Sequence, residues 1–247
     1  MAEFDNRVLR GQAGTAATID EGLRAHMLRV YNYMLSGLVL TGISAWIVAN
    51  VAPVRSLFFQ YLPQQGTYSL SMLGWVALFA PLGLVLLLSF CINRMSVQAA
   101  QGTFWGYAAL MGVSLAPFLL LYTGASVAQV FFITAATFGA MSLWGYTTKR
   151  DLTGLGSFLF MGLIGLIIAS LVGMFFQSSM LQFIISVAGV LIFTGLTAYD
   201  TQKIKEMYYA EMDGTVAGRA AIMGALALYL DFINLFIMLM RLMGDRR

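Results

Sequence analysis

Seven long apolar runs constrain the fold of this chain more than any other feature of its sequence. A helix needs about 20 predominantly apolar residues to cross the hydrocarbon core of a bilayer. Runs of this kind occupy residues 30–51, 68–92, 102–122, 126–146, 155–176, 181–199 and 220–239. The short stretches between them contain Pro, Gly, Asn or charged residues, which end helices. The sequence therefore predicts an all-α polytopic membrane protein with seven transmembrane helices.

The composition supports this prediction and excludes several classes of function. Of the 247 residues, 60% are hydrophobic and 10% are charged, whereas a soluble domain carries about 25% charged residues. Lipid, the first partner we expect, must therefore cover much of the exterior. The single cysteine, Cys91, and the single histidine, His26, exclude an intramolecular disulfide and a Cys- or His-rich metal site, and we expect no cofactor. A net charge of +3 without a basic run gives no support for nucleic-acid binding.

The distribution of basic residues predicts the orientation. Ten of the 14 Lys and Arg residues lie in the N-terminal segment or after the second, fourth and sixth runs, all on one side of the membrane. Because cytoplasmic segments are enriched in these residues, we expect a cytoplasmic N-terminus in a plasma (inner) membrane. Seven spans put the C-terminus outside, together with Arg241, Arg246 and Arg247. If the last run were re-entrant, these three would be cytoplasmic, and this six-span alternative stays open.

The chain divides into a polar segment, residues 1–29, and a seven-span domain, residues 30–247. Up to about residue 18 the segment is small and polar, so we expect it to be mobile. From Asp20 apolar residues recur at helical spacing, which predicts a short interfacial helix leading into the first span. The third and fourth runs are so close in sequence that we expect them to form a tight helical hairpin.

Asp231 is the first candidate site residue, because it lies in the middle of the last run. A charged side chain at mid-span costs about 2.5–3.5 kcal/mol on insertion scales, and such residues usually serve function. Asn234 follows three residues later on the same helical face, where it can support Asp231 by a hydrogen bond. The alternative is a purely structural aspartate that bonds to a neighbouring helix.

Asp200, at the end of the sixth run, is the second candidate. It precedes Lys203 by three residues, so a simple surface ion pair is the alternative reading. If Asp200 and Asp231 face one interior site, both cannot ionise cheaply, and one is expected to keep its proton. Such a pair can sense pH and can bind a hard cation such as Ca²⁺. One geometric difficulty is that Asp231 lies on the order of 16 Å into its span, at 1.5 Å per residue, while Asp200 lies at the membrane edge.

Arg94 follows the second run on the predicted cytoplasmic side. Its long side chain can reach towards an acidic site and act as a latch. The alternative is an anchor that only contributes to the orientation of the chain.

Two motifs connect the aspartates to a known family. Residues 199–204 read Tyr-Asp-Thr-Gln-Lys-Ile, and residues 228–236 read Leu-Tyr-Leu-Asp-Phe-Ile-Asn-Leu-Phe. Both resemble the motifs of the Bax inhibitor-1 membrane family, as does Gly-Tyr-Ala at residues 106–108. The resemblance covers the chain from about Arg24 onwards. It implies seven helices, with the last one central between two three-helix layers.

The resemblance also implies a function, a pH-sensitive calcium leak gated by an aspartate pair. Asp200 and Asp231 occupy the positions of that pair, and Arg94 falls near the position of a latch arginine, although the local match there is loose. Ca²⁺ and protons are then the ions that pass or bind.

Two other functions remain open at this point. The protein can act as a regulator that binds and restrains a membrane protein such as a membrane-bound protease, through its helix faces and N-terminal segment. An intramembrane aspartyl protease is the third reading. It ranks last because neither aspartate has the Gly-Asp pair of such enzymes, so we expect that the protein is not an enzyme.

Overall fold

The structure, a computed structural model, describes residues 2–62, 67–176, 178–209 and 212–246. Seven of its helices are long and apolar enough to cross a membrane. The chain is an all-α polytopic membrane protein, as the sequence predicts. The seven helices are α1 (Ala2–Asn50), α3 (Met72–Cys91), α4 (Val97–Leu121), α5 (Gly124–Thr147), α6 (Thr153–Phe175), α7 (Ser179–Glu206) and α8 (Gly214–Met243).

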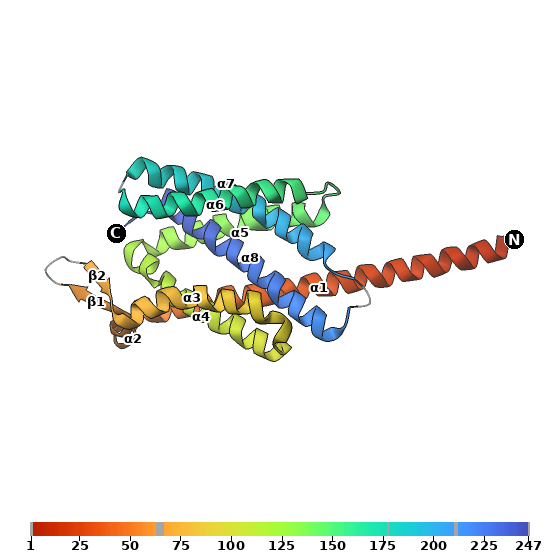
Figure 1. The fold of residues 1–247 in the computed structure, drawn as a ribbon, viewed down its shortest axis with the longest axis horizontal. Coiled ribbons are helices and arrows are strands. Elements are labelled where there is room, and N and C mark those ends of the chain that lie inside the picture. The colour runs from red at the N-terminus through yellow and green to blue at the C-terminus, as the bar shows by residue number, and fades with distance from the viewer. Residues whose placement is uncertain (1, 63–66, 177, 210–211, 247) are drawn as a thin grey trace.

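The helices form two layers with the last helix between them (Figure 1). Helices α1, α3 and α4 pack together in one layer, and α5, α6 and α7 in the other. Helix α8 contacts both layers, mainly through α1 and α7. The two termini lie at opposite ends of the bundle, so the last helix crosses from one side to the other and the six-span alternative is wrong.

The sequence of α8 explains its central place. In its most apolar window 72% of the residues are buried, against 17–33% in the other six spans. A helix that is apolar on all sides belongs in a core. The other six helices expose large apolar side chains, among them Val39, Phe79, Phe132 and Ile168, as a surface in contact with lipid requires.

The third and fourth spans do not form the tight hairpin that their spacing predicts. Tyr122 and Thr123 join α4 to α5 in a short turn, but the two helices diverge into different layers and barely touch. The reason is that α8 occupies the space between the layers. The chain after α8 also packs at this turn. Thr123 N donates to Asp245 O at 3.0 Å, and the backbones of Tyr122 and Arg246 pair as an isolated antiparallel β-bridge.

Regular structure continues on both sides of the first span. Helix α1 runs without interruption from Ala2, and the division of the chain at residue 29 stays a prediction. The side chains of residues 1–20 lie outside the described residues, and so does the expectation of mobility there. After α1, the chain forms a short helix, α2 (Ala52–Phe58), and an antiparallel hairpin of β1 (Phe59–Leu62) and β2 (Thr67–Leu70). A 3-10 turn, η1 (Ile92–Arg94), follows α3.

Close contact between α5 and α7 depends on one glycine. A Cβ atom at Gly145 would meet the backbone of Ala198, whereas a Cβ atom at Gly139, on the same helix, would meet nothing within 4 Å. Backbone atoms cannot move aside as a flexible side chain can. The two helices therefore approach each other through Gly145, in the part of α7 that also carries Asp200.

We predict that Gly145→Ala destabilises the protein, because the new methyl group forces α5 and α7 apart. Overpacking of this kind costs about 1–3 kcal/mol. Thermal unfolding of the detergent-purified protein measures the loss. Gly139→Ala is the matched control and should unfold at or slightly above the wild-type temperature, since alanine favours a helix. Equal unfolding temperatures for the two variants would contradict this packing.

Candidate functional site

Helix α7 carries Asp200 towards the interior of the bundle. The helix continues to Glu206, so Asp200 lies within it and not at its end, and the side chain is half-buried. Lys203 lies three residues further on, with its ammonium nitrogen 5.8 Å from the centre of the Tyr199 ring. This ammonium group is close enough to act electrostatically on Asp200.

Helix α8 carries Asp231 to the same place. Asp231 is 4% exposed, and the side chains of Asp231 and Asp200 are within hydrogen-bonding reach of each other. Two carboxyl groups can share a hydrogen bond only if one of them holds a proton. The second oxygen of Asp231, Oδ2, has no hydrogen-bond partner among the described residues. This oxygen is therefore available to a proton, a water molecule or a cation.

The geometry resolves the difference in depth that the sequence suggested. Helix α8 crosses the bundle obliquely (Figure 1), so each residue on the way to Asp231 adds less than about 1.5 Å of depth. Helix α7 extends beyond Asp200 by six residues. Both aspartates consequently lie inside the bundle, away from its two ends.

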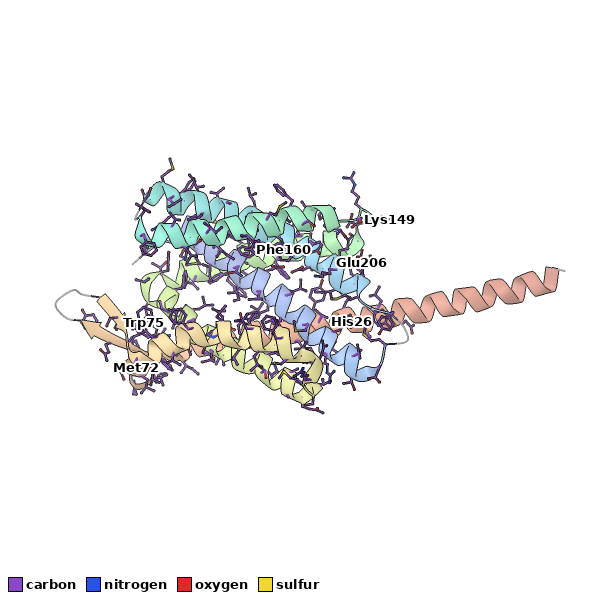
Figure 2. The ribbon with its side chains drawn as sticks, viewed as in Figure 1. His26, Met72, Trp75, Lys149, Phe160 and Glu206 are labelled. Carbon is purple, nitrogen blue, oxygen red and sulfur yellow. The ribbon has the colours of Figure 1, made fainter. Side chains whose placement is uncertain are left out.

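A cavity of about 1310 Å³ extends from the aspartates between the two layers. Its walls come from the C-terminal end of α4 and from α6, α7 and α8. Asp200, Asp231 and Asn234 line one part of it. Arg241, in the last turn of α8, and Arg246, just after the helix, also line it. Figure 2 shows Phe160 on the side of α6 that faces α8, and this ring lines the cavity as well. The pair of carboxyl groups thus opens into a space large enough for ions and water.

Asn234 and Arg94, the two residues predicted to support the aspartates, lie in different places. Asn234 lines the cavity, but its amide donates to the carbonyl of Leu230 at 2.9 Å. Arg94 is exposed at the end of η1 and is not among the residues that line the cavity. Its turn is tied to α8, since Arg219 Nη1 donates to Asn93 O at 2.9 Å. The latch role of Arg94 stays a prediction.

A chain of hydroxyl groups beside Asp200 was not found by sequence reasoning. Tyr31 of α1 bonds Ser142 of α5 at 2.6 Å, and Ser142 bonds Thr201 of α7 at 3.0 Å. Thr201 also donates to the carbonyl of Thr197 at 2.7 Å. The chain links three helices around the residue that follows Asp200. Hydroxyl side chains in apolar runs are the only signal for it, and that signal does not identify partners.

Comparison with known proteins agrees with this architecture. The family model described as inhibitor of apoptosis-promoting Bax1 matches residues 23–247. The chain belongs to the Bax inhibitor-1 family. Its similarity to other proteins extends over nearly their whole length. It is 52% identical to an uncharacterized protein, RP147, of Rickettsia prowazekii over 230 residues, which cover 93% of each chain.

Two further relatives place this Bax inhibitor-1 protein among bacterial sequences. It is 48% identical to an uncharacterized protein of Caulobacter vibrioides over 233 residues, covering 93% of this chain and 92% of that one. It is 46% identical to the inner membrane protein YbhL of Escherichia coli over 228 residues, covering 92% and 94%. Both the family match and the seven helices identify an integral, multi-pass membrane protein.

We predict that Thr201→Val destabilises this Bax inhibitor-1 protein by about 0.5–1.5 kcal/mol, because it removes a hydroxyl group that joins α7 to α5. Thermal unfolding in detergent measures the effect. Thr197→Val is the control, since the hydroxyl group of Thr197 bonds only to its own helix, at Phe193 O. If the control lost as much stability as Thr201→Val, the link between the helices would contribute nothing.

Proposed function

We propose that the protein is a pH-sensitive cation leak that conducts Ca²⁺ across a bacterial inner membrane, with Asp200 and Asp231 as its proton sensor. The observation that carries this proposal is the meeting of two carboxyl groups inside the bundle, at one end of a large cavity. The family resemblance supports the same function. The comparisons give no sign of an enzymatic activity.

Electrostatics explains how the pair responds to pH. Two unit charges about 4 Å apart repel each other by about 4 kcal/mol at an effective dielectric constant of 20. A shared proton removes this repulsion and holds α7 against α8. Loss of the proton at higher pH leaves two carboxylates, which repel each other unless a cation lies between them. The ionised pair therefore both loosens the contact of the helices and attracts Ca²⁺.

The surroundings of the two carboxyl groups allow the pair to gain and lose a proton or a cation. Asp231 Oδ2 has no partner among the described residues, so no protein hydrogen bond competes with a proton or an ion there. Lys203 follows Asp200 by three residues on α7, so its positive charge lies near the pair. When the pair holds one proton, this charge partly balances the remaining carboxylate.

We predict that calcium uptake into liposomes with an internal dye rises between pH 6 and pH 8 for the wild type. In Asp231→Asn and Asp200→Asn the repulsion cannot develop, so uptake should stay low and lose its dependence on pH. No uptake above protein-free liposomes at any pH, with the protein folded and inserted, would overturn the leak. Restraint of a membrane-protein partner would then be the function to test.

Asp151→Asn is the matched control for the charge change. Asp151 lies in the loop between α5 and α6, where hydrogen bonds from the Thr153 side chain and backbone lower its pKa. Because this pKa is lowered from an already acidic value, Asp151 stays ionised throughout pH 6–8 and contributes no titration there. The variant should keep the pH response of the wild type.

We also propose that the N-terminus is cytoplasmic, on the evidence of the basic residues. Lys149 and Glu206 lie at the end of the bundle near which α1 enters, and Met72 and Trp75 lie at the opposite end (Figure 2). The end with Lys149 holds most of the basic loop residues. The positive-inside rule assigns it to the cytoplasm.

Cysteine labelling tests this orientation. In a Cys91→Ser background, Ser179→Cys should react with an impermeant maleimide added to intact spheroplasts. Asn93→Cys, at the other end, should react only after the membrane is permeabilised. Both side chains that are replaced are exposed. The reverse pattern would show that the N-terminus is outside.

A further inference from the structure

The part of the cavity that lies away from the aspartates is a groove between the two layers. We call it the interlayer groove and define it by Leu121 of α4, Ile167 and Leu171 of α6, Phe183 of α7 and Arg241 of α8, all of which line the cavity. Four of these five side chains are apolar. They form a long apolar wall that ends in a basic group.

The groove is open to the side of the protein. Leu121 is 59% exposed, Ile167 is 52% exposed and Phe183 is 58% exposed. These residues belong to membrane-spanning helices, so what they face is the hydrocarbon of the bilayer. The acyl chains of the surrounding lipids can pack against these apolar side chains.

The basic end of the groove is held in place by the chain that follows α8. The backbone of Arg246 pairs with that of Tyr122 in an isolated β-bridge, and Asp245 N donates to Ser126 Oγ at 3.0 Å. These contacts fix residues 245 and 246 against the turn between α4 and α5. Arg241, in the last turn of α8, and Arg246, after the helix, therefore line the same groove.

The charges at this end favour an anion. Asp245, whose side chain is exposed, is the carboxylate between the two arginines in sequence, so it offsets only one of the two positive charges. Ser179 and Gln182, from the first turn of the 28-residue helix α7, also line the cavity. The N-terminal end of a helix carries partial positive charge and adds to the field of the arginines.

We propose that the interlayer groove binds an anionic phospholipid of the membrane. Its phosphate lies against Arg241 and Arg246, which can bind it through charge-assisted hydrogen bonds. One acyl chain runs along the groove towards the aspartates. Binding depends only on the groove and its arginines, so it does not require that the protein conducts ions.

The dimensions agree with one leaflet of a bilayer. Asp231 and Arg241 are ten residues apart on α8, which corresponds to about 15 Å at 1.5 Å per residue. Half of a hydrocarbon core about 30 Å thick is the same length. An acyl chain that runs along α8 from a phosphate at Arg241 is therefore long enough to reach the aspartates.

Native mass spectrometry of the detergent-purified protein tests the proposal. We expect phosphatidylglycerol to bind about tenfold more tightly than phosphatidylcholine, whose choline cation would face two arginines. In the variant Arg241→Gln/Arg246→Gln this preference should fall to within about twofold. Arg55→Gln removes a basic residue at the same end of the bundle but outside the groove, and it should keep the full preference.

Two results would overturn the proposal. One is an equal affinity of the wild-type protein for the two lipids, or a preference that survives in the double variant. The other is binding of glycerol 3-phosphate as tight as that of phosphatidylglycerol, because the apolar wall would then contribute nothing.

A second measurement uses the wild type alone and does not depend on the folding of a variant. Phosphatidylglycerol with a photoreactive group in the acyl chain should label peptides of α6 and α7 that contain Ile167 or Phe183. A tenfold excess of unlabelled phosphatidylglycerol should reduce this labelling, and phosphatidylcholine should not. Labelling that is uniform over all exposed helices, including Phe79 of α3, would show that no site exists.

Discussion

The contact of two carboxyl groups inside a membrane protein is the interaction on which the rest of this structure depends. Asp231 of α8 is almost completely buried, and the carboxyl group of Asp200, on α7, lies next to it. A bilayer offers no water to stabilise such groups, so their charge has to be balanced by a proton, by a cation or by Lys203. The cavity that both aspartates line gives such a proton or cation a place beside them.

The surrounding helices keep the pair in a defined place by close packing. Gly145 lets α5 approach the backbone of Ala198, two residues before Asp200. On the other side of the bundle a Cβ atom at Gly112 would meet the backbone carbonyl of Thr41, so α1 and α4 are equally close. Each layer is therefore closely packed, and the space between the layers holds α8 and the cavity.

Much of the fold could be predicted from the sequence, because length and hydropathy alone determine which segments cross a bilayer. The two aspartates also stood out, since a charge in an apolar run is costly. What could not be predicted is packing between segments. The spacing of α4 and α5 suggested a hairpin, but the helix that separates them, α8, begins only at Gly214. The hydroxyl chain from Tyr31 to Thr201 likewise depends on the fold and not on sequence separation.

The central place of α8 also bears on how the protein is made. The helix that fills the middle of the bundle leaves the ribosome after the other six spans, and domains generally acquire structure from the N-terminal end during synthesis. The six earlier helices are therefore in the membrane before α8 can pack between the two layers. The aspartate pair does not exist until α8 has been made. Synthesis that stops before Gly214 would leave a chain with six membrane segments and no central helix between the two layers.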